Sequence, residues 1–229
     1  MQGQARIKTV NVGMIGTNCY VLYKADNENN DNLNDNVIDN KQSTKQAIIV
    51  DPGDDAEKIY NAVEQLDVTP VAVLLTHGHF DHILAVNEVA SKYNIYIYAS
   101  DAEKQLLEDD NLNLSASYRR NCTVKKYVAL KDKEKINLAG FEITPILTPG
   151  HTAGSTSYYI DDEKILFSGD MLFQESVGRT DFPTGSDRDI INSLNNKLMK
   201  LDDSVKVYPG HGPDTTIGYE RQCNPYVVR

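Results

Sequence analysis

The stretch Thr-His-Gly-His-Phe-Asp-His at residues 76–82 decides how the rest of the sequence is interpreted. It directly follows an apolar run at 71–75 that is typical of a buried β-strand. Four metal-binding side chains therefore lie just past a strand end: His77, His79, Asp81 and His82. Imidazole and carboxylate are preferred ligands of zinc, iron and manganese, so the stretch predicts a metal site rather than a loop whose histidines only form hydrogen bonds.

The remaining two histidines have the same placement. An apolar run at 143–148 leads into Pro-Gly-His151, and another at 205–208 leads into Pro-Gly-His211. A further apolar run ends in Ser-Gly-Asp170. The strand ends thus offer five imidazoles and two carboxylates, which is too many donors for one tetrahedral zinc and appropriate for two metals with a bridging group.

Short apolar runs rich in Val, Ile and Tyr predict nine strands, at 6–12, 19–23, 46–50, 71–75, 95–98, 141–147, 156–160, 165–167 and 205–208. Helical periodicity is visible at 54–66 and 82–93, and Ser100 and Ser186 are each followed three residues later by an acidic residue, which predicts two further helix starts. Strands and helices do not alternate strictly. We therefore expect an α/β domain with mixed sheets, spanning residues 1–229 as one unit.

Residues 26–40 differ in composition from the rest of the chain. This stretch holds seven Asn and five acidic residues but no Lys or Arg. It cannot bury enough apolar surface to offset its ordering entropy, so we expect a flexible loop inserted between two strands. Its acids lack the spacing of an EF-hand, which disfavours a calcium loop.

The charge balance limits the classes of partner. There are 23 Lys and Arg against 33 Asp and Glu, giving a net charge of −10 that argues against nucleic-acid or anionic-membrane binding. Neither a signal-peptide pattern nor an 18-residue apolar run is visible, and the three cysteines form no Cys-x-x-Cys pair. We expect a cytoplasmic protein with a small-molecule substrate and no membrane partner. The sequence does not indicate an oligomeric state.

The motifs together resemble those of the metallo-β-lactamase fold superfamily, and within it the glyoxalase II-like hydrolases. The similarity covers almost the whole chain and runs in family order through Asp51-Pro-Gly, residues 76–82, Gly-His151-Thr, Gly-Asp170 and Gly-His211. It implies a four-layer αβ/βα sandwich of two mixed β-sheets with outer helices and a metal site along one edge.

The resemblance also implies a role for each donor. The first metal would be bound by His77, His79 and His151. The second metal would be bound by Asp81, His82 and His211, with Asp170 bridging the two ions. Asp51 would orient a ligand from outside the coordination sphere, although an Asp before Pro-Gly is also a common turn residue. Two divalent ions per chain are implied, with zinc as the first candidate and iron or manganese as alternatives.

Individual positions narrow the branch of the family. A carboxylate at Asp170 resembles the thioesterase and oxygenase branches, whereas β-lactamases commonly carry Cys or Ser there. His79 speaks against the di-iron oxygen reductases, which carry Glu. Residues 177–183 resemble a segment of small glyoxalase II-like proteins, in which Arg179 either meets a substrate carboxylate or pairs with a nearby aspartate. Only 18 residues follow His211, so the helical glutathione-binding extension of full-length glyoxalase II is not expected.

The expected activity is that of a metallohydrolase, a hydroxyacylglutathione hydrolase-like thioesterase. A hydroxide bridging two metals would attack the carbonyl of an acyl-thioester, with Asp81 as the catalytic residue that orients it. A thiolate, with a pKa near about 8.5, leaves without a general acid. The alternatives are a mononuclear-iron persulfide dioxygenase, a lactonase or other ester hydrolase of the same fold, and a scaffold stabilised by metal, which would need only four donors.

Overall fold

The computed structural model describes residues 3–25 and 45–228. One six-stranded sheet has the order β1-β2-β3-β4-β5-β6. Its strands are β1 (Ala5–Val12), β2 (Thr17–Lys24), β3 (Lys45–Val50), β4 (Val68–Leu74), β5 (Tyr96–Ser100) and β6 (Val128–Leu130). Antiparallel pairing joins β1, β2 and β3, and parallel pairing joins β3 through β6, so the sheet is mixed.

The second six-stranded sheet has the order β14-β13-β10-β9-β8-β7 and is also mixed, since only β10 and β13 are parallel. Its strands are β7 (Ile136–Leu138), β8 (Phe141–Leu147), β9 (Thr156–Ile160), β10 (Ile165–Gly169), β13 (Lys206–Pro209) and β14 (Thr215–Thr216). A small hairpin pairs β11 (Leu172–Phe173) with β12 (Ser176–Val177).

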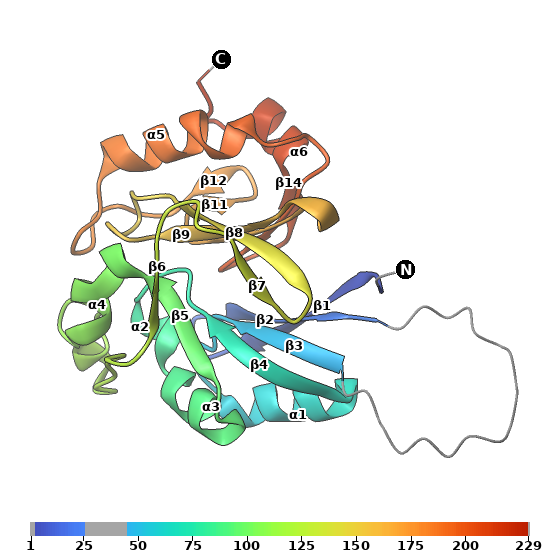
Figure 1. Ribbon diagram of the computed structural model, residues 1–229. Coiled ribbons are helices and arrows are strands. Elements are labelled where there is room, and N and C mark those ends of the chain that lie inside the picture. The colour runs from blue at the N-terminus through green and yellow to red at the C-terminus, as the bar shows by residue number, and fades with distance from the viewer. Residues whose placement is uncertain (1–2, 26–44, 229) are drawn as a thin grey trace, which may run out of the picture.

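Helices cover the outer face of each sheet (Figure 1). Below the first sheet lie α1 (Ala56–Leu66) and α3 (Val86–Tyr93), and above the second lie α5 (Asp187–Asn196) and α6 (Ile217–Cys223). Two shorter helices, α2 (Phe80–Ile83) and α4 (Lys104–Glu108), lie near the edge where the sheets meet. The predicted four-layer sandwich of two mixed sheets is thus confirmed, whereas the proposed loop insertion at 26–40 lies outside the described residues.

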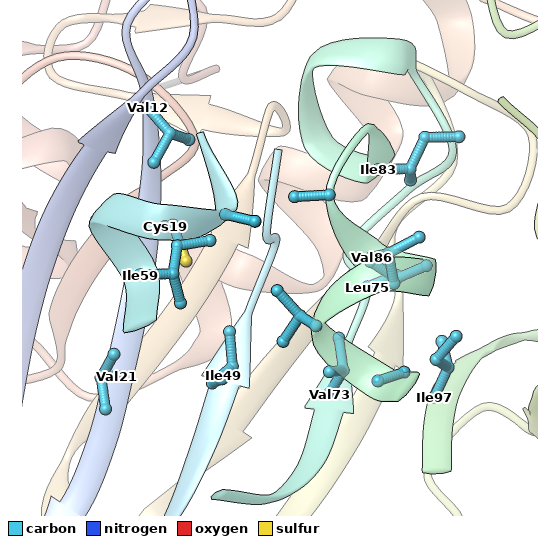
Figure 2. Packing of buried hydrophobic residues seen from close by; sticks show 14 of the residues in the cluster. Val12, Cys19, Val21, Ile49, Ile59, Val73, Leu75, Ile83, Val86 and Ile97 are labelled. Atoms are coloured by element: carbon cyan, nitrogen blue, oxygen red, sulfur yellow. The ribbon is translucent and has the colours of Figure 1, made fainter. Parts of the chain in front are cut away.

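The two faces of the first sheet pack into two different hydrophobic cores, because side chains alternate between the faces along each strand. In β3, Ala47 and Ile49 face the outer helices, and Ile48 and Val50 face the second sheet. Because side chains alternate between the faces of a strand, a nearly continuous apolar run is required where both faces are buried. Figure 2 shows the outer core, in which Ile49 packs among side chains from β1, β2, β4 and the helices.

The structure differs from the sequence prediction in the helix expected at 82–93. It is divided into α2 and α3, because the backbone N–H of Ala85 donates to Pro52 O and that of Leu84 donates to Gly53 O as well as to Phe80 O. These bonds from outside the helix interrupt its ladder and anchor the loop after β3. Short strands such as β6, β7 and β14 were not predicted, because two or three residues are too few to show the alternation of apolar and polar side chains.

The two predicted helix caps have different outcomes. Ser186 caps α5 by accepting a hydrogen bond from the backbone N–H of Asp189, as predicted. Ser100 accepts from Ala102 instead and begins a 3₁₀ turn at Asp101–Glu103 that leads into α4.

Among the described helices, none combines the length and apolar character that a membrane crossing requires. The three cysteines are free.

Candidate metal centre

Four strand-to-loop junctions supply the seven predicted metal ligands. The stretch 76–82 follows β4, His151 lies four residues after β8, Asp170 directly follows β10, and His211 follows β13 by two residues. The structure brings all seven side chains together at one edge of the sandwich, where they form three overlapping groups of potential metal ligands.

The first group consists of His77, His79 and His151. His79 Nδ1 faces His151 Nε2 at 2.8 Å, and the His77 ring centroid lies 4.9 Å from that of His79 and 4.8 Å from that of His151. All three imidazoles are buried. Three nitrogens converging in this way match the ligand set of a catalytic zinc-type site, which keeps a further position for solvent or substrate.

The second group consists of Asp81, His82 and His211. Asp81 Oδ2 lies 3.1 Å from His211 Nε2 and 3.5 Å from His82 Nε2. A carboxylate with two imidazoles is a mixed oxygen and nitrogen set that suits zinc, iron or manganese.

The third group consists of His77, His82 and Asp170, and it shares one histidine with each of the other two groups, so that Asp170 lies between them. Its Oδ1 is 3.3 Å from His82 Nε2, whereas its Oδ2 is 3.5 Å from His211 Nε2 and 3.6 Å from His151 Nε2. One carboxylate therefore faces donors of both groups, as a bridging ligand must. The arrangement is consistent with a dinuclear site.

Asp51 holds the end of β4 and one histidine in place. Its Oδ1 accepts from the backbone N–H of Thr76 at 2.8 Å, and its Oδ2 accepts from Thr76 Oγ1 at 2.6 Å. His82 Nδ1 lies 2.9 Å from the same Oδ2, which leaves Nε2 directed at the other donors. A carboxylate behind a metal-bound histidine fixes its ring and tautomer. Asp51 is therefore more than a turn residue.

Buried atoms without partners test whether metal ions fit. Among the described residues, the buried side-chain atoms that lack a hydrogen-bond partner all belong to predicted ligands: Nε2 of His77, His79 and His82, and Oδ1 of Asp170. An unsatisfied buried polar atom costs roughly 1–3 kcal/mol, so such a cluster is unfavourable unless something binds it. Cations satisfy imidazole and carboxylate together, and the donor set fits them.

The charge states of the ligands favour a cation as well. Burial and the nearby His151 imidazole lower the pKa of His79 to about 3, so its ring is neutral and one ring nitrogen has a lone pair available for a cation. Burial disfavours a charged His82, but the surrounding carboxylates outweigh it and raise the pKa of that imidazole well above its usual value. A bound cation would replace this proton among the carboxylates.

Comparison with known proteins agrees with this geometry. The sequence matches the profile of the Metallo-beta-lactamase superfamily over residues 35–211. The chain belongs to the metallo-beta-lactamase superfamily. It is 39% identical over 187 residues to the probable metallo-hydrolase YqgX of Bacillus subtilis, covering 81% of this chain and 89% of that protein. It is 35% identical over 189 residues to hydroxyacylglutathione hydrolase GloC of Haemophilus influenzae, covering 80% and 88%.

Solved structures of the superfamily show the same fold. The BLEG-1 B3 metallo-beta-lactamase superimposes with a TM-score of 0.85 at 39% identity, covering 98% of this chain and 100% of that chain. The chain is therefore a metallo-hydrolase of the superfamily, and its seven predicted ligands lie close together at one edge of the sandwich.

Arg179 is placed beside the metallo-hydrolase site in two ways. Its backbone O lies 2.7 Å from His151 Nδ1 and fixes that ring. Its guanidinium forms two hydrogen bonds of 2.6 Å with Asp181 and lies 3.9 Å from the Phe182 ring centroid. The nearby aspartate that pairs with Arg179 is thus Asp181, whereas Asp187, the other aspartate close in the sequence, accepts from Thr180. The Arg179 side chain also lines the cleft over the metal centre.

The cleft has a volume of about 380 Å³. Its floor contains five of the predicted ligands, and its walls are mainly apolar or aromatic. The wall residues are Ile15, Phe80, Leu114, Tyr118, Phe173, Arg179 and Phe182.

Residues at the start of β2, which sequence reasoning did not single out, hold the second donor group. Thr17 Oγ1 donates to Asp81 Oδ2 at 2.9 Å. Asn18 spans the loop that carries His211: its backbone N–H donates to Gly210 O at 2.8 Å, and its Nδ2 donates to Pro209 O at 3.1 Å and to Gly212 O at 2.9 Å. The only available signal was a Thr-Asn pair at a strand start, which carries no chemistry by itself.

Replacing Asn18 with alanine is expected to weaken the second metal about 10- to 100-fold, because the loop of His211 loses two of its side-chain hydrogen bonds. Competition with a chromophoric chelator measures the affinity of each ion. Asn87→Ala is the matched control, since Asn87 Nδ2 makes one bond, to Thr123 O. Wild-type affinity for both ions in Asn18→Ala would contradict the positioning role.

Glu103 is a second residue that the sequence did not indicate as part of the site. It is buried, and its carboxylate accepts from the backbone N–H of Gly78 at 2.8 Å, from Thr152 Oγ1 at 2.9 Å and from the backbone N–H of Gly154 at 2.8 Å. Glu103 thereby joins the loop of His77 and His79 to the loop of His151. The sequence suggested only a capping role.

The stability contributed by Glu103 is expected to depend on pH. Burial raises the pKa of this carboxyl from 4.5 to about 7, despite the three donors, which lower it. The folded state then binds the proton more tightly than the unfolded state, so stability falls as pH rises between these values. Relative to Glu103→Gln, the unfolding free energy of metal-free wild type should fall by about 3 kcal/mol between pH 4.5 and 7. Denaturant titrations check this, and a difference that does not vary with pH would refute it.

Proposed function

We propose that this metallo-hydrolase is a thioester hydrolase with two divalent metal ions, of the hydroxyacylglutathione hydrolase type. The observation that carries the proposal is the position of Asp170 between two donor groups at the floor of a cleft. The likeness to GloC, a hydroxyacylglutathione hydrolase, supports the choice of substrate class. Zinc is the preferred metal, with iron or manganese as alternatives.

Each group of residues in the site would have a different role in such a reaction. Bound divalent ions supply a Lewis acid for the carbonyl and lower the pKa of a water molecule. We assign Asp81 the task of accepting a hydrogen bond from the attacking water and orienting it, while Thr17 and His211 fix the carboxylate itself. All five histidines belong to donor groups, so none is left as a general acid. A thiolate leaving group needs none.

Hydrolysis of a β-lactam is a second candidate, favoured by the 39% identity to the BLEG-1 B3 metallo-beta-lactamase. Both reactions use water to attack a carbonyl, but their leaving groups differ. The amide nitrogen of a β-lactam must gain a proton as it leaves, whereas a thiolate leaves unprotonated. All five histidines belong to the proposed donor groups, so none is free to supply that proton and the site suits the thioester better.

Metal-loaded protein is expected to hydrolyse S-lactoylglutathione and simple acyl-thioesters and to contain two metal ions per chain by elemental analysis. Treatment with a chelator should abolish the activity, and added zinc, iron or manganese should restore it. A cephalosporin and a persulfide, the latter with oxygen uptake recorded, are run in parallel. Hydrolysis of only the cephalosporin would favour the second candidate. Oxygen uptake with the persulfide, together with one iron per chain, would contradict the hydrolase proposal and favour the persulfide dioxygenase.

A further inference from the structure

A second, smaller cavity adjoins the metal cleft. Its volume is about 220 Å³, against about 380 Å³ for the cleft. Four residues line both cavities: Ile15, Phe80, Asp81 and Tyr118. Since Asp81 is a predicted metal ligand, the smaller cavity begins beside the second donor group. A substrate bound in the cleft would therefore have this cavity beside it.

Three separate segments bring apolar side chains to this cavity. The turn between β1 and β2 supplies Met14 and Ile15, α2 supplies Phe80, the residue just after α2 is Leu84, and the 3₁₀ turn at Ala116–Tyr118 supplies Tyr118. The rings of Phe80 and Tyr118 stack with centroids 4.0 Å apart. The cavity wall is thus an apolar surface assembled from residues that are distant in the sequence.

Exposed apolar residues are concentrated here. Met14 is 85% exposed, Tyr118 47% and Ile15 46%. These three belong to the eight large apolar side chains that are exposed in the described part of the chain. Gathering apolar surface at a site opening is characteristic of a binding surface, whereas scattered exposed residues need no explanation.

The turn that displays Met14 and Ile15 is fixed by its own hydrogen bonds. The backbone N–H of Gly13 donates to Asp55 Oδ2 at 3.1 Å, and Asn11 Nδ2 donates to Gly16 O at 2.8 Å. The apolar wall is therefore held in position before any ligand arrives, which lowers the entropic cost of binding.

Each charged side chain that lines the cavity has a polar or charged partner. Arg120 binds both carboxylate oxygens of Asp54, at 3.1 Å and 2.9 Å. Asp81 Oδ2 is engaged by Thr17 and His211. Since these acidic and basic groups are paired, the cavity favours an uncharged, apolar occupant over a carboxylate or an ammonium group.

We propose that this cavity, lined by Met14, Ile15, Phe80, Leu84 and Tyr118, is a subsite for the apolar acyl group of the substrate. The assignment deepens the proposed function and rests on it for the nature of the reacting group. The protein would then prefer thioesters with an aliphatic or aryl acyl chain over acetyl or other short acyl groups. Met14, Ile15 and Tyr118 would be the specificity-determining residues.

Binding of straight-chain carboxylates to zinc-loaded protein tests the subsite without requiring hydrolysis. The carboxylate occupies the position of the reacting carbonyl, and calorimetry compares acetate, butanoate, hexanoate and octanoate. Burial of each methylene is expected to tighten binding about three- to fourfold until the cavity is full. An affinity that does not change from acetate to octanoate would overturn the proposal.

Two variants locate the effect. Tyr118→Ser and, independently, Met14→Ser should flatten the dependence of affinity on chain length, and both positions are exposed enough for the fold to be retained. Tyr96→Ser is the matched control, because Tyr96 is 72% exposed on β5 and lines neither cavity. A chain-length dependence in Tyr118→Ser and Met14→Ser as steep as in wild type would contradict the assignment.

Kinetics separate this proposal from the function on which it rests. With one thiol and a series of acyl groups, kcat/KM should rise from acetyl to hexanoyl in wild type and less in Tyr118→Ser. If no thioester is hydrolysed but carboxylate affinity still rises with chain length, the thioesterase proposal fails and the subsite stands. If thioesters are hydrolysed equally well whatever their acyl length, the subsite fails and the function stands.

Discussion

Replacing Asp81 with alanine is expected to lower kcat for thioester hydrolysis at least about a hundred- to a thousandfold and to reduce the metal content from two ions to one. The second donor group would keep only its two imidazoles and a share of Asp170, because Asp81 Oδ2 is the oxygen that faces both rings. The proposed contact that orients the attacking water would be lost together with the ligand. Elemental analysis and steady-state kinetics on the same preparation measure both effects.

The variant also leaves the buried hydroxyl of Thr17 without its acceptor, which costs roughly 1–3 kcal/mol of stability. Asp81→Asn separates this loss from catalysis, since its amide oxygen can still accept from Thr17 but carries no charge. Asp161→Ala is a control acid, exposed and paired with Lys164. Full activity with two bound ions in Asp81→Ala would contradict both the ligand assignment and the catalytic role.

Replacing Gly53 with alanine is expected to destabilise the fold by about 3 kcal/mol or more and to weaken the second metal site. A Cβ at residue 53 would lie 1.7 Å from the backbone O of Asp81 and 2.8 Å from its carbonyl carbon. Two pieces of backbone cannot make room as a flexible side chain can, so the loop of Asp81 and His82 must move. Chemical denaturation and metal competition measure the two consequences.

Gly212→Ala is the matched control for Gly53→Ala. Gly212 also neighbours a predicted ligand, His211, but a Cβ there would meet no atom within 4 Å. Its φ of +74° makes alanine unfavourable by about 1 kcal/mol, without a collision. If Gly53→Ala were no more damaging than Gly212→Ala, close packing against Asp81 would not be what requires glycine.

The predictable part of the site consists of residues whose chemistry is visible in the sequence pattern. A single histidine after an apolar run indicates little, but five histidines and two aspartates that all follow apolar runs predict metal ligands, and these seven side chains lie together in the structure. Asp51 was predicted only through family resemblance, and its three contacts give it a definite orienting role. The role of Arg179 toward the substrate stays a prediction, since its guanidinium is paired with Asp181.

The parts that could not be predicted depend on partners far away in the chain. Asn18 contacts Pro209 across 191 residues, and Glu103 joins two loops that lie 25 and 49 or more residues from it. Neither residue type implies such a role, because asparagine and glutamate are common on surfaces. The break between the two helices at Leu84 was unpredictable for the same reason, since the carbonyl groups that interrupt the helix belong to Pro52 and Gly53, about thirty residues earlier in the chain.

The sequence by itself indicated an α/β domain with mixed sheets, the main strands and seven candidate metal ligands, because strand periodicity and ligand chemistry are local properties, while the four-layer arrangement was implied by the family resemblance. Only the tertiary structure decided which neighbours hold those ligands and where an apolar cavity adjoins them. Asn18 bonds to the loop of His211, and Met14 and Tyr118 line one cavity, through the packing of the two sheets and their loops. Such contacts depend on the three-dimensional path of the whole chain, which no short stretch of residues encodes.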